Sequence, residues 1–258
     1  NGFTVDDIDG GTTNESGRTY VSFAWDAGTA ANSSVTSCSQ TVNGQWTNPT
    51  TGFSITSWEG GGGAGQTVAH GLGAKPDFHA SKRIDGTQNW HCYHSALGAE
   101  YQMTLDSSDA KEDSTNGFND TEPTNTLITY GNESKVGNTD THITFAWTSI
   151  PGFSAFGSYE ATGTSGLFVH LGFKPAFLII KGADHISSWN MRDNKRDSSN
   201  PNEAQMVANW YTAETTQEDI DFVSNGFVVR STDAGFNSSN TFLYCAWAEH
   251  PFKTSRAN

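Results

Sequence analysis

Hydrophobic and polar residues alternate along several short stretches of the chain, which predicts β-strands. The segment Thr141–Trp147 places an isoleucine, a phenylalanine and a tryptophan on one face and smaller or polar residues on the other, as in a half-buried strand. The run Phe177–Lys181 is apolar except at its end and predicts a strand buried on both faces. The best helical candidate, Glu203–Ala208, is too short to shape the fold. The pattern predicts an all-β protein.

Internal repetition is the strongest signal in the sequence. A motif made of His, then Leu-Gly-x-Lys-Pro, occupies residues 70–76 and returns at residues 170–175. Its proline recurs after 99 residues, and Trp90 recurs as Trp189 after the same 99 residues. Landmarks that return in the same order at a fixed interval indicate a duplicated structural unit.

Two later landmarks extend the repeat. Asn116-Gly117-Phe118 is answered by Asn225-Gly226-Phe227, and in both places Asn-Gly predicts a tight turn that feeds the next strand. The strand-like segment Ile143–Trp147 is answered by Leu243–Trp247. We therefore expect tandem β-sandwich or barrel-like units of about 100–120 residues each.

A third, partial copy precedes these units. Residues 1–5 and 20–25 match only the closing strands of a unit, so residues 1–47 are predicted to hold a truncated repeat. Residues 48–150 form the first full repeat in this interpretation, and residues 151–258 form the second. The truncated strands are expected to pair with an upstream part of the polypeptide, a neighbouring unit or another subunit.

Composition and charge narrow the range of partners. The 16 Phe, 8 Trp and 7 Tyr residues predict a core built largely from rings. The formal net charge of −14 would repel nucleic-acid phosphates and anionic membrane surfaces, and no basic patch offsets it. The sequence contains no apolar run of the ~20 residues that a bilayer-spanning helix needs. We expect neither nucleic-acid binding nor membrane insertion.

Candidate metal ligands are weakly patterned. The three cysteines share no metal-ligand spacing, and the His91-x-x-His94 spacing is not kept in the second unit. The acidic clusters at residues 6–9 and 106–113 do not match the calcium loop of an EF-hand, although a calcium ion there would suit an acidic extracellular β-protein. We predict no metal site and no cofactor.

The repeated landmarks are assigned structural roles. An imidazole ahead of a turn can bond to backbone carbonyl groups and hold the loop, and tryptophans at equivalent positions are expected in the core. The predicted structural residues are His70, Gly73, Pro76, Trp90, Trp147, His170, Gly172, Pro175, Trp189 and Trp247.

Aromatic residues near Asn- or Gly-rich loops are candidates for carbohydrate contact. Rings cover the apolar faces of sugars while nearby amides satisfy the hydroxyl groups. On this basis Trp46, Trp58 and Trp210 are predicted glycan-binding residues. No nucleophile elbow and no recurring Ser, His and Asp set is present, so we predict no catalytic residues and no enzymatic activity.

The ordered landmarks resemble a repeat family of virion structural proteins from tailed phages, especially marine and cyanobacterial phages. The residues that carry the resemblance are His70–Pro76, Trp90–His94, Asn225–Phe227 and Ala246–Lys253. The second unit departs from the pattern, because it lacks the Gly after His170 and the Tyr-His after Trp189.

The resemblance implies a tail fibre, spike or appendage on the surface of a virus particle. For such an appendage we expect contacts with other virion proteins, self-association such as a trimer, and contact with a host-surface glycan. Two alternatives remain at this stage. A secreted carbohydrate-active enzyme would need a cleft with two carboxylates about 5–10 Å apart, and a cell-surface adhesin would share the same scaffold.

Overall fold

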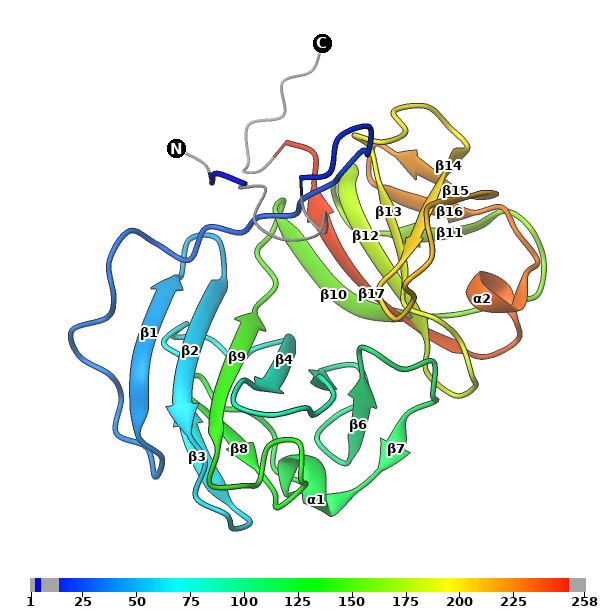
Figure 1. Cartoon of the computed structure of the whole chain (residues 1–258). Helices are drawn as coiled ribbons and strands as arrows, with labels where there is room; N and C mark the ends of the chain where they lie inside the picture. The colour runs from blue at the N-terminus through cyan, green and yellow to red at the C-terminus, as the bar shows by residue number, and fades with distance from the viewer. Residues whose placement is uncertain (1–2, 6–13, 251–258) are drawn as a thin grey trace.

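The computed structural model describes residues 3–5 and 14–250, and almost all of its regular structure is β-strand (Figure 1). Each of the two helices has four residues: α1 (Thr115–Phe118) and α2 (Ala234–Asn237). All strand pairings are antiparallel. The prediction of an all-β protein is confirmed.

The first unit contains a seven-stranded sheet and a two-stranded sheet. The larger sheet has the order β1-β2-β9-β4-β5-β6-β7, and β3 pairs with β8. Its strands are β1 (Val42–Asn48), β2 (Phe53–Glu59), β3 (Gln66–Ala69), β4 (Phe78–Arg83), β5 (His91–His94), β6 (Tyr101–Thr104), β7 (Glu112–Asp113), β8 (Leu127–Tyr130) and β9 (Thr141–Trp147).

The second unit is one eight-stranded, nearly closed, barrel-like sheet with the order β10-β17-β12-β13-β14-β15-β16-β11. Its strands are β10 (Ser154–Glu160), β11 (Leu167–His170), β12 (Pro175–Gly182), β13 (Asn190–Asp193), β14 (Asn202–Val207), β15 (Thr215–Val223), β16 (Gly226–Val229) and β17 (Thr241–Ala248).

The two units share their strand order. The closing strand β9 lies between β2 and β4, and the closing strand β17 lies between β10 and β12. Pro76 precedes β4 and Pro175 begins β12, and these strands place Phe78 opposite Trp147 and Phe177 opposite Trp247. The Lys-Pro motif therefore has the same backbone setting in both units. The units differ at β1, which has no counterpart beside β10, and at β7, which has two residues and does not reach β8.

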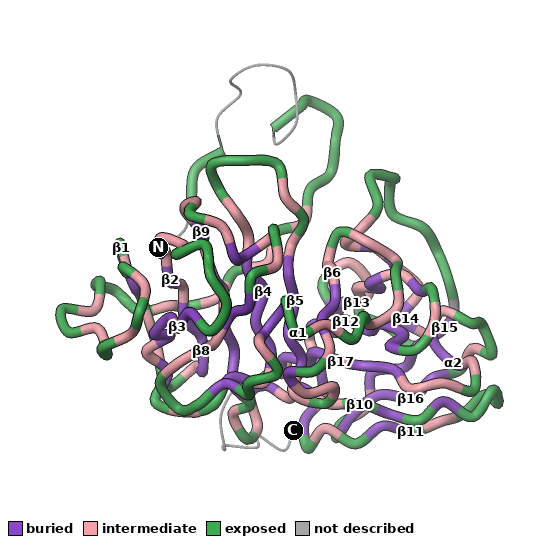
Figure 2. Tube along the Cα trace, turned by 90° about the horizontal axis from the view of Figure 1, so that it is seen from below, coloured by how far each residue is buried: buried purple, intermediate pink, exposed green. Residues whose placement is uncertain are grey.

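Three hydrophobic clusters make up the core. One lies inside the first unit and includes Trp58 and Tyr130, and a second lies inside the second unit and includes Phe227. The third contains rings from both units, among them Trp147 and Trp247. The buried segments follow the strands, while the connecting loops are mostly exposed (Figure 2). No helix of the described chain is long and apolar enough to cross a membrane.

The prediction of a helix at Glu203–Ala208 is wrong. Residues 202–207 form strand β14, which pairs with β13 on one side and β15 on the other. Its residues have reasonable helix propensity, but the two neighbouring strands supply hydrogen bonds to the backbone. Tertiary pairing outweighs a propensity of a few tenths of a kcal/mol per residue.

The two Asn-Gly-Phe landmarks are not equivalent, which corrects a second prediction. Asn225 precedes β16 directly, as expected of a turn. Asn116-Gly117-Phe118 instead lies in α1, ahead of β8. A Cβ atom at Gly117 would lie 2.4 Å from the Gln102 side-chain oxygen, so this glycine packs closely against that side chain.

Neither segment that was matched to the closing strands of a unit forms a strand in the described residues. Residues 3–5 have no strand, residues 1–2 lie outside the description, and Tyr20–Trp25 is a segment without assigned strand pairing. Within the described part of residues 1–47, the regular structure is β1, which pairs with β2 of the first unit.

Candidate functional site

Three tryptophans, one from each copy of the Ala-Trp landmark, meet between the two units. Trp25 lies 5.6 Å from Trp147 and 5.3 Å from Trp247, and Trp147 lies 6.2 Å from Trp247, measured between ring centroids. All three pairs are edge-to-face, the geometry that aromatic quadrupoles favour. We call this set the tryptophan triangle.

Further rings extend the triangle into both units. Phe78 of β4 stacks against Phe156 of β10 at 6.2 Å, and Phe78 also contacts Trp189. Phe23, which precedes the triangle in sequence, stacks on Phe177 of β12 at 4.1 Å. The two units therefore share one aromatic core, which we call the seam.

Polar contacts border the seam along one side. The Lys111 ammonium lies 2.7 Å from the Asp184 carboxylate, and the Lys111 amide donates to the Ala183 carbonyl. The Trp189 indole N–H donates to the Thr104 carbonyl at 2.9 Å. These contacts join the loop after β6 to the loop between β12 and β13, so they fix how the two units are oriented.

The histidine landmarks have different environments. His70 is buried, donates from Nε2 to the Thr124 carbonyl and accepts from the Leu72 amide at Nδ1. These two bonds hold the loop that precedes β4. His170 is exposed at the end of β11, and its imidazole makes no hydrogen bond to the described residues. The proposed loop-holding role is therefore available to His70 alone.

Gly73 and Gly172 adopt the same left-handed backbone, with φ of +72° and +83°. Replacing either residue by alanine should lower the free energy of unfolding by about 1 kcal/mol, because a Cβ atom strains this conformation. Gly63 is the matched control: a Cβ there would meet no atom within 4 Å and its φ is not left-handed. Urea denaturation of the three alanine variants measures the difference, and an equal effect at all three positions would contradict it.

The tryptophan landmarks differ in exposure. Trp147, Trp189 and Trp247 are buried, whereas Trp90 is only half-buried. The backbone around Trp90 and Trp189 is nonetheless the same, because the Trp90 amide donates to Asp106 at 2.9 Å and the Trp189 amide donates to Asn209 at 2.9 Å.

The three predicted glycan-binding tryptophans differ in how far their side chains are exposed. Trp58 is fully buried and its indole N–H donates to the Thr144 hydroxyl, so it cannot stack on a sugar and that assignment is wrong. Trp46 is 41% exposed on β1 and Trp210 is 51% exposed in the loop between β14 and β15. Tyr211 is completely exposed beside Trp210. Tyr211 is not among the predicted glycan-binding residues, although it is adjacent to Trp210 in the sequence.

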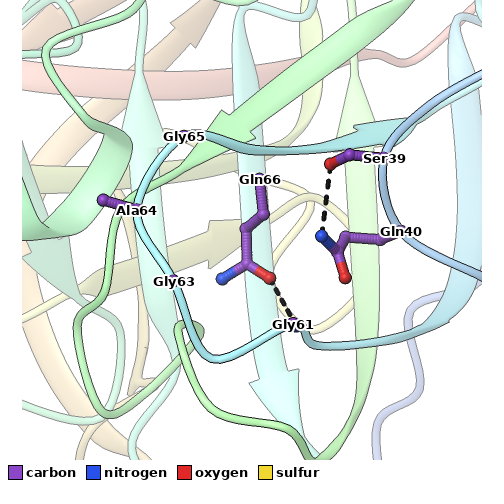
Figure 3. A pocket seen from close by; sticks show the side chains of 7 residues that line it. All are labelled: Ser39, Gln40, Gly61, Gly63, Ala64, Gly65 and Gln66. Carbon is purple, nitrogen blue, oxygen red and sulfur yellow. Dashed lines mark hydrogen bonds between the residues drawn. The ribbon is translucent and has the colours of Figure 1, made fainter.

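A shallow hollow of about 250 Å³ lies between the loop before β1 and the glycine-rich loop before β3 (Figure 3). Gln66 points into it, and its side-chain oxygen accepts from the Gly61 amide at 2.7 Å. The Gln66 side-chain nitrogen donates to the carbonyls of Gly131 and Val136. Because its groups are already bonded within the protein, the hollow offers little to a ligand. No carboxylate lines it.

One comparison with known proteins gives a match. A family model described as a domain of unknown function, DUF7483, matches residues 1–251. The chain belongs to the DUF7483 family. No curated protein and no solved structure matches it.

In this DUF7483 chain, buried histidines collect inside the first unit. His79 and His91 are fully buried, and burial holds the pKa of His79 well below its usual value and lowers that of His91 to about 3. His79 stacks on Tyr93 with ring centroids 5.0 Å apart. No group of three or more His, Cys, Asp or Glu side chains within the described residues is placed to hold a metal ion.

Two carboxylates of the acidic cluster at residues 106–113 of the DUF7483 chain accept hydrogen bonds from nearby protein groups. Asp106 accepts from the Trp90 amide, and Asp109 accepts from the Ser107 hydroxyl at 2.6 Å. The cluster at residues 6–9 lies outside the described residues. Another surface hollow is lined mainly by residues between 194 and 202. It contains a single carboxylate, Asp197, whereas a glycosidase site needs a pair of carboxylates.

Proposed function

We propose that this DUF7483 chain is a structural protein of a tailed-phage particle, in a tail fibre, spike or appendage. The observation that carries the proposal is the tryptophan triangle, because the residues that recur along the chain pack the units onto each other. A ring-filled seam gives a stiff body, which suits a part that must hold a binding surface away from the particle. The resemblance of the landmarks to virion repeat proteins supports the same assignment.

The location is tested on particles purified from the phage that encodes the chain. We expect the chain at a fixed copy number per particle by quantitative mass spectrometry, and labelling of a tail or surface appendage by gold-conjugated antibodies. Recovery of the chain only from culture medium or from the host envelope would contradict the proposal. Those outcomes would favour the secreted enzyme and the adhesin, respectively.

The contact with the host surface is assigned to the exposed loop that carries Trp210 and Tyr211. Two adjacent exposed rings offer a platform for the apolar face of a sugar. The neighbouring Asn209 amide oxygen is already bonded to the Trp189 backbone, so the loop is anchored at its base. Weak contacts of this kind gain strength when many copies act together on one particle.

Removing both rings should abolish glycan binding without affecting the fold. In the Trp210→Ala/Tyr211→Ala variant we expect at least a tenfold loss of binding to host-surface polysaccharide, because stacking on sugar supplies the contact. Phe168→Ala, which removes a similarly exposed ring on β11, is the matched control. Surface plasmon resonance on immobilised polysaccharide measures both variants. Unchanged binding by the double variant, or an equal loss in Phe168→Ala, would contradict the assignment to this loop.

A further inference from the structure

The loop between β13 and β14 surrounds a small hollow whose lining is rich in oxygen atoms. The hollow has a volume of about 30 Å³, which is room for one ion or one water molecule. Its lining includes Asn194, Asp197, Ser199 and Asn202. We call it the loop hollow.

Two amide oxygens of this lining are buried without a hydrogen-bond partner. Asn194 is 7% exposed and Asn202 is 1% exposed, and neither side-chain Oδ1 is bonded to a described residue. The orientation of the Asn202 amide is fixed, because its Nδ2 donates to the carbonyls of Asp193 and Asp197 at 2.8 Å each. Buried acceptors without a partner destabilise the fold unless an occupant satisfies them. The occupant must therefore be a cation or a hydrogen-bond donor.

Asp197 adds a negative charge that no ion pair neutralises. The basic side chains around the hollow are each held by another carboxylate: Lys174 by Glu249 at 2.9 Å, Arg192 by Asp219 at 2.8 Å and Arg196 by Asp193 at 2.5 Å. Among the described residues, no basic group lies within salt-bridge distance of the Asp197 carboxylate. The free charge at the hollow favours a cation as the occupant.

The loop is held in place by bonds that leave the two amide oxygens free. The Asn200 side chain donates to the Phe222 carbonyl and accepts from the Phe222 amide, both at 2.9 Å. The Asp197 carboxylate accepts from the Glu203 amide at 2.7 Å and from the Ser199 hydroxyl at 3.0 Å. Walls that are fixed in this way present ligand atoms without reorganisation.

The repeat shows that the fold does not require this oxygen-rich lining. In the first unit, residues 95–100 join β5 to β6, as residues 194–201 join β13 to β14. The loop of the first unit contains neither asparagine nor aspartate, and its Ala99 is buried. Because small apolar residues make the same connection there, the polar groups of the second loop serve another purpose.

We propose that the loop hollow is a calcium site, in which Asn194 and Asn202 supply amide oxygens and Asp197 supplies a carboxylate oxygen. Calcium binds about six to eight oxygen atoms from carboxylates, carbonyls and water, and it tolerates irregular geometry. Hydroxyl groups and backbone carbonyls of the loop, together with water, complete its shell. The spacing of charged residues does not reveal such a site in the sequence, because only one of the three ligand side chains is charged.

Other occupants match the lining less well. Zinc prefers thiolate and imidazole ligands, and none of the described residues that line the hollow is Cys or His. Magnesium keeps several waters in a strict octahedral shell, for which a volume of about 30 Å³ leaves no room. A single water molecule can donate to both amide oxygens, but it leaves the charge of Asp197 unbalanced. Calcium satisfies all three groups.

The proposal is tested by NMR titration of the 258-residue chain with calcium chloride at constant ionic strength. We expect saturable shifts of the amide signals of residues 194–202, with a Kd on the order of 10⁻⁴–10⁻³ M, the range of extracellular calcium modules. Magnesium chloride at the same concentrations should leave these signals unchanged. A response without saturation at about 10 mM calcium, or an equal response to magnesium, would overturn the proposal and assign the hollow to water.

Two substitutions separate the site from the general attraction of cations to an acidic protein. Asn194→Ala removes a free oxygen from a side chain that makes no hydrogen bond to a described residue, so the Kd should rise at least about tenfold in a folded variant. Lys195→Ala is the matched control, because this exposed neighbour does not line the hollow. It should bind calcium as tightly as the parent or more tightly. Equal affinity in Asn194→Ala and the parent would overturn the proposal.

The melting temperature gives an independent measurement. At about 10 mM calcium, a site of this affinity should raise the Tm of the parent by roughly 3–10 °C, because the ion binds the folded chain. Without calcium, Asn194→Ala should have the Tm of the parent, and added calcium should raise it little. A lower Tm of Asn194→Ala without calcium, together with the same gain as the parent, would show that Asn194 serves the fold alone and would overturn the proposal.

Discussion

Replacing Trp147 by alanine should lower the free energy of unfolding by about 3–5 kcal/mol, the usual cost of removing a large buried ring. Trp147 is 8% exposed and contacts rings of β2, β4, β17 and the segment before β1. Loss of the ring leaves a cavity at the point where both units meet. Urea denaturation followed by circular dichroism measures the change.

The location of the cavity makes the effect specific to the seam. Each aromatic pair adds about 0.5–1.5 kcal/mol beyond the area that it buries, and Trp147 takes part in pairs with both other members of the triangle. We therefore expect Trp147→Ala to uncouple the units, so that one unfolding transition becomes two. A single transition with unchanged steepness would show that the units are held together by the polar border instead.

Two further variants serve as controls for Trp147→Ala. Trp147→Phe keeps most of the ring area and removes an indole N–H that has no hydrogen-bond partner among the described residues, so it should cost less than about 1.5 kcal/mol. Trp210→Ala removes an exposed ring and should change stability by no more than about 0.5 kcal/mol. A loss in Trp147→Ala as small as that of Trp210→Ala would contradict the seam as the main contact between the units.

The sequence was sufficient to predict the strands and the repeated unit, because these depend on local patterns. Alternation identifies β9 and its counterpart β17, and the Lys-Pro pair marks the entry to the central strands β4 and β12. Proline is confined to such positions by its missing N–H, which makes it a dependable marker. The spacing of these landmarks then indicates a duplication.

Predictions that needed tertiary information failed. Trp58 lies beside a glycine-rich loop in sequence, yet the strand buries it against Tyr130 and His142. Asn116-Gly117 resembles a turn in isolation, but it lies in α1, where Gly117 packs against the Gln102 side chain. Neither the burial of a ring nor the approach of a distant side chain is encoded in neighbouring residues.

The meeting of the three rings in the tryptophan triangle also depends on tertiary structure that the sequence pattern does not contain. Equal spacing predicted that Trp147 and Trp247 have equivalent positions, each in the core of its own unit. It could not predict that both rings, together with Trp25, converge between the units. Equivalence in a repeat concerns position within a unit, whereas convergence depends on how the units rotate relative to one another.

Acidification should destabilise the first unit strongly. His70, His79, His91 and His94 are buried, and burial lowers the pKa of His70 and His94 to about 4, that of His91 to about 3 and that of His79 well below its usual value. In the unfolded chain these imidazoles take up protons near pH 6.5. Stability is therefore complete above pH 6.5 and falls as the pH drops from 6.5 toward 4.

The expected size of this effect follows from proton linkage. At pH 5 each such histidine favours the unfolded state by about 2 kcal/mol, so the four together amount to about 8 kcal/mol. That is comparable with the whole stability of a typical domain, about 5–15 kcal/mol. Urea denaturation at pH 7.5 and pH 5 should show a large fall in the midpoint. An unchanged midpoint would contradict the burial of these rings as neutral groups.

A single substitution separates this mechanism from a general effect of acid. His79 stacks on Tyr93, and both of its ring nitrogens lack hydrogen-bond partners among the described residues, so His79→Phe keeps the ring contact and removes the titrating group. The variant should be at least as stable as the parent at pH 7.5, and at pH 5 it should retain about 2 kcal/mol more of its stability. His170→Phe is the control, because His170 is exposed. If both variants respond to acid as the parent does, the loss of stability arises from carboxylates and not from the buried histidines.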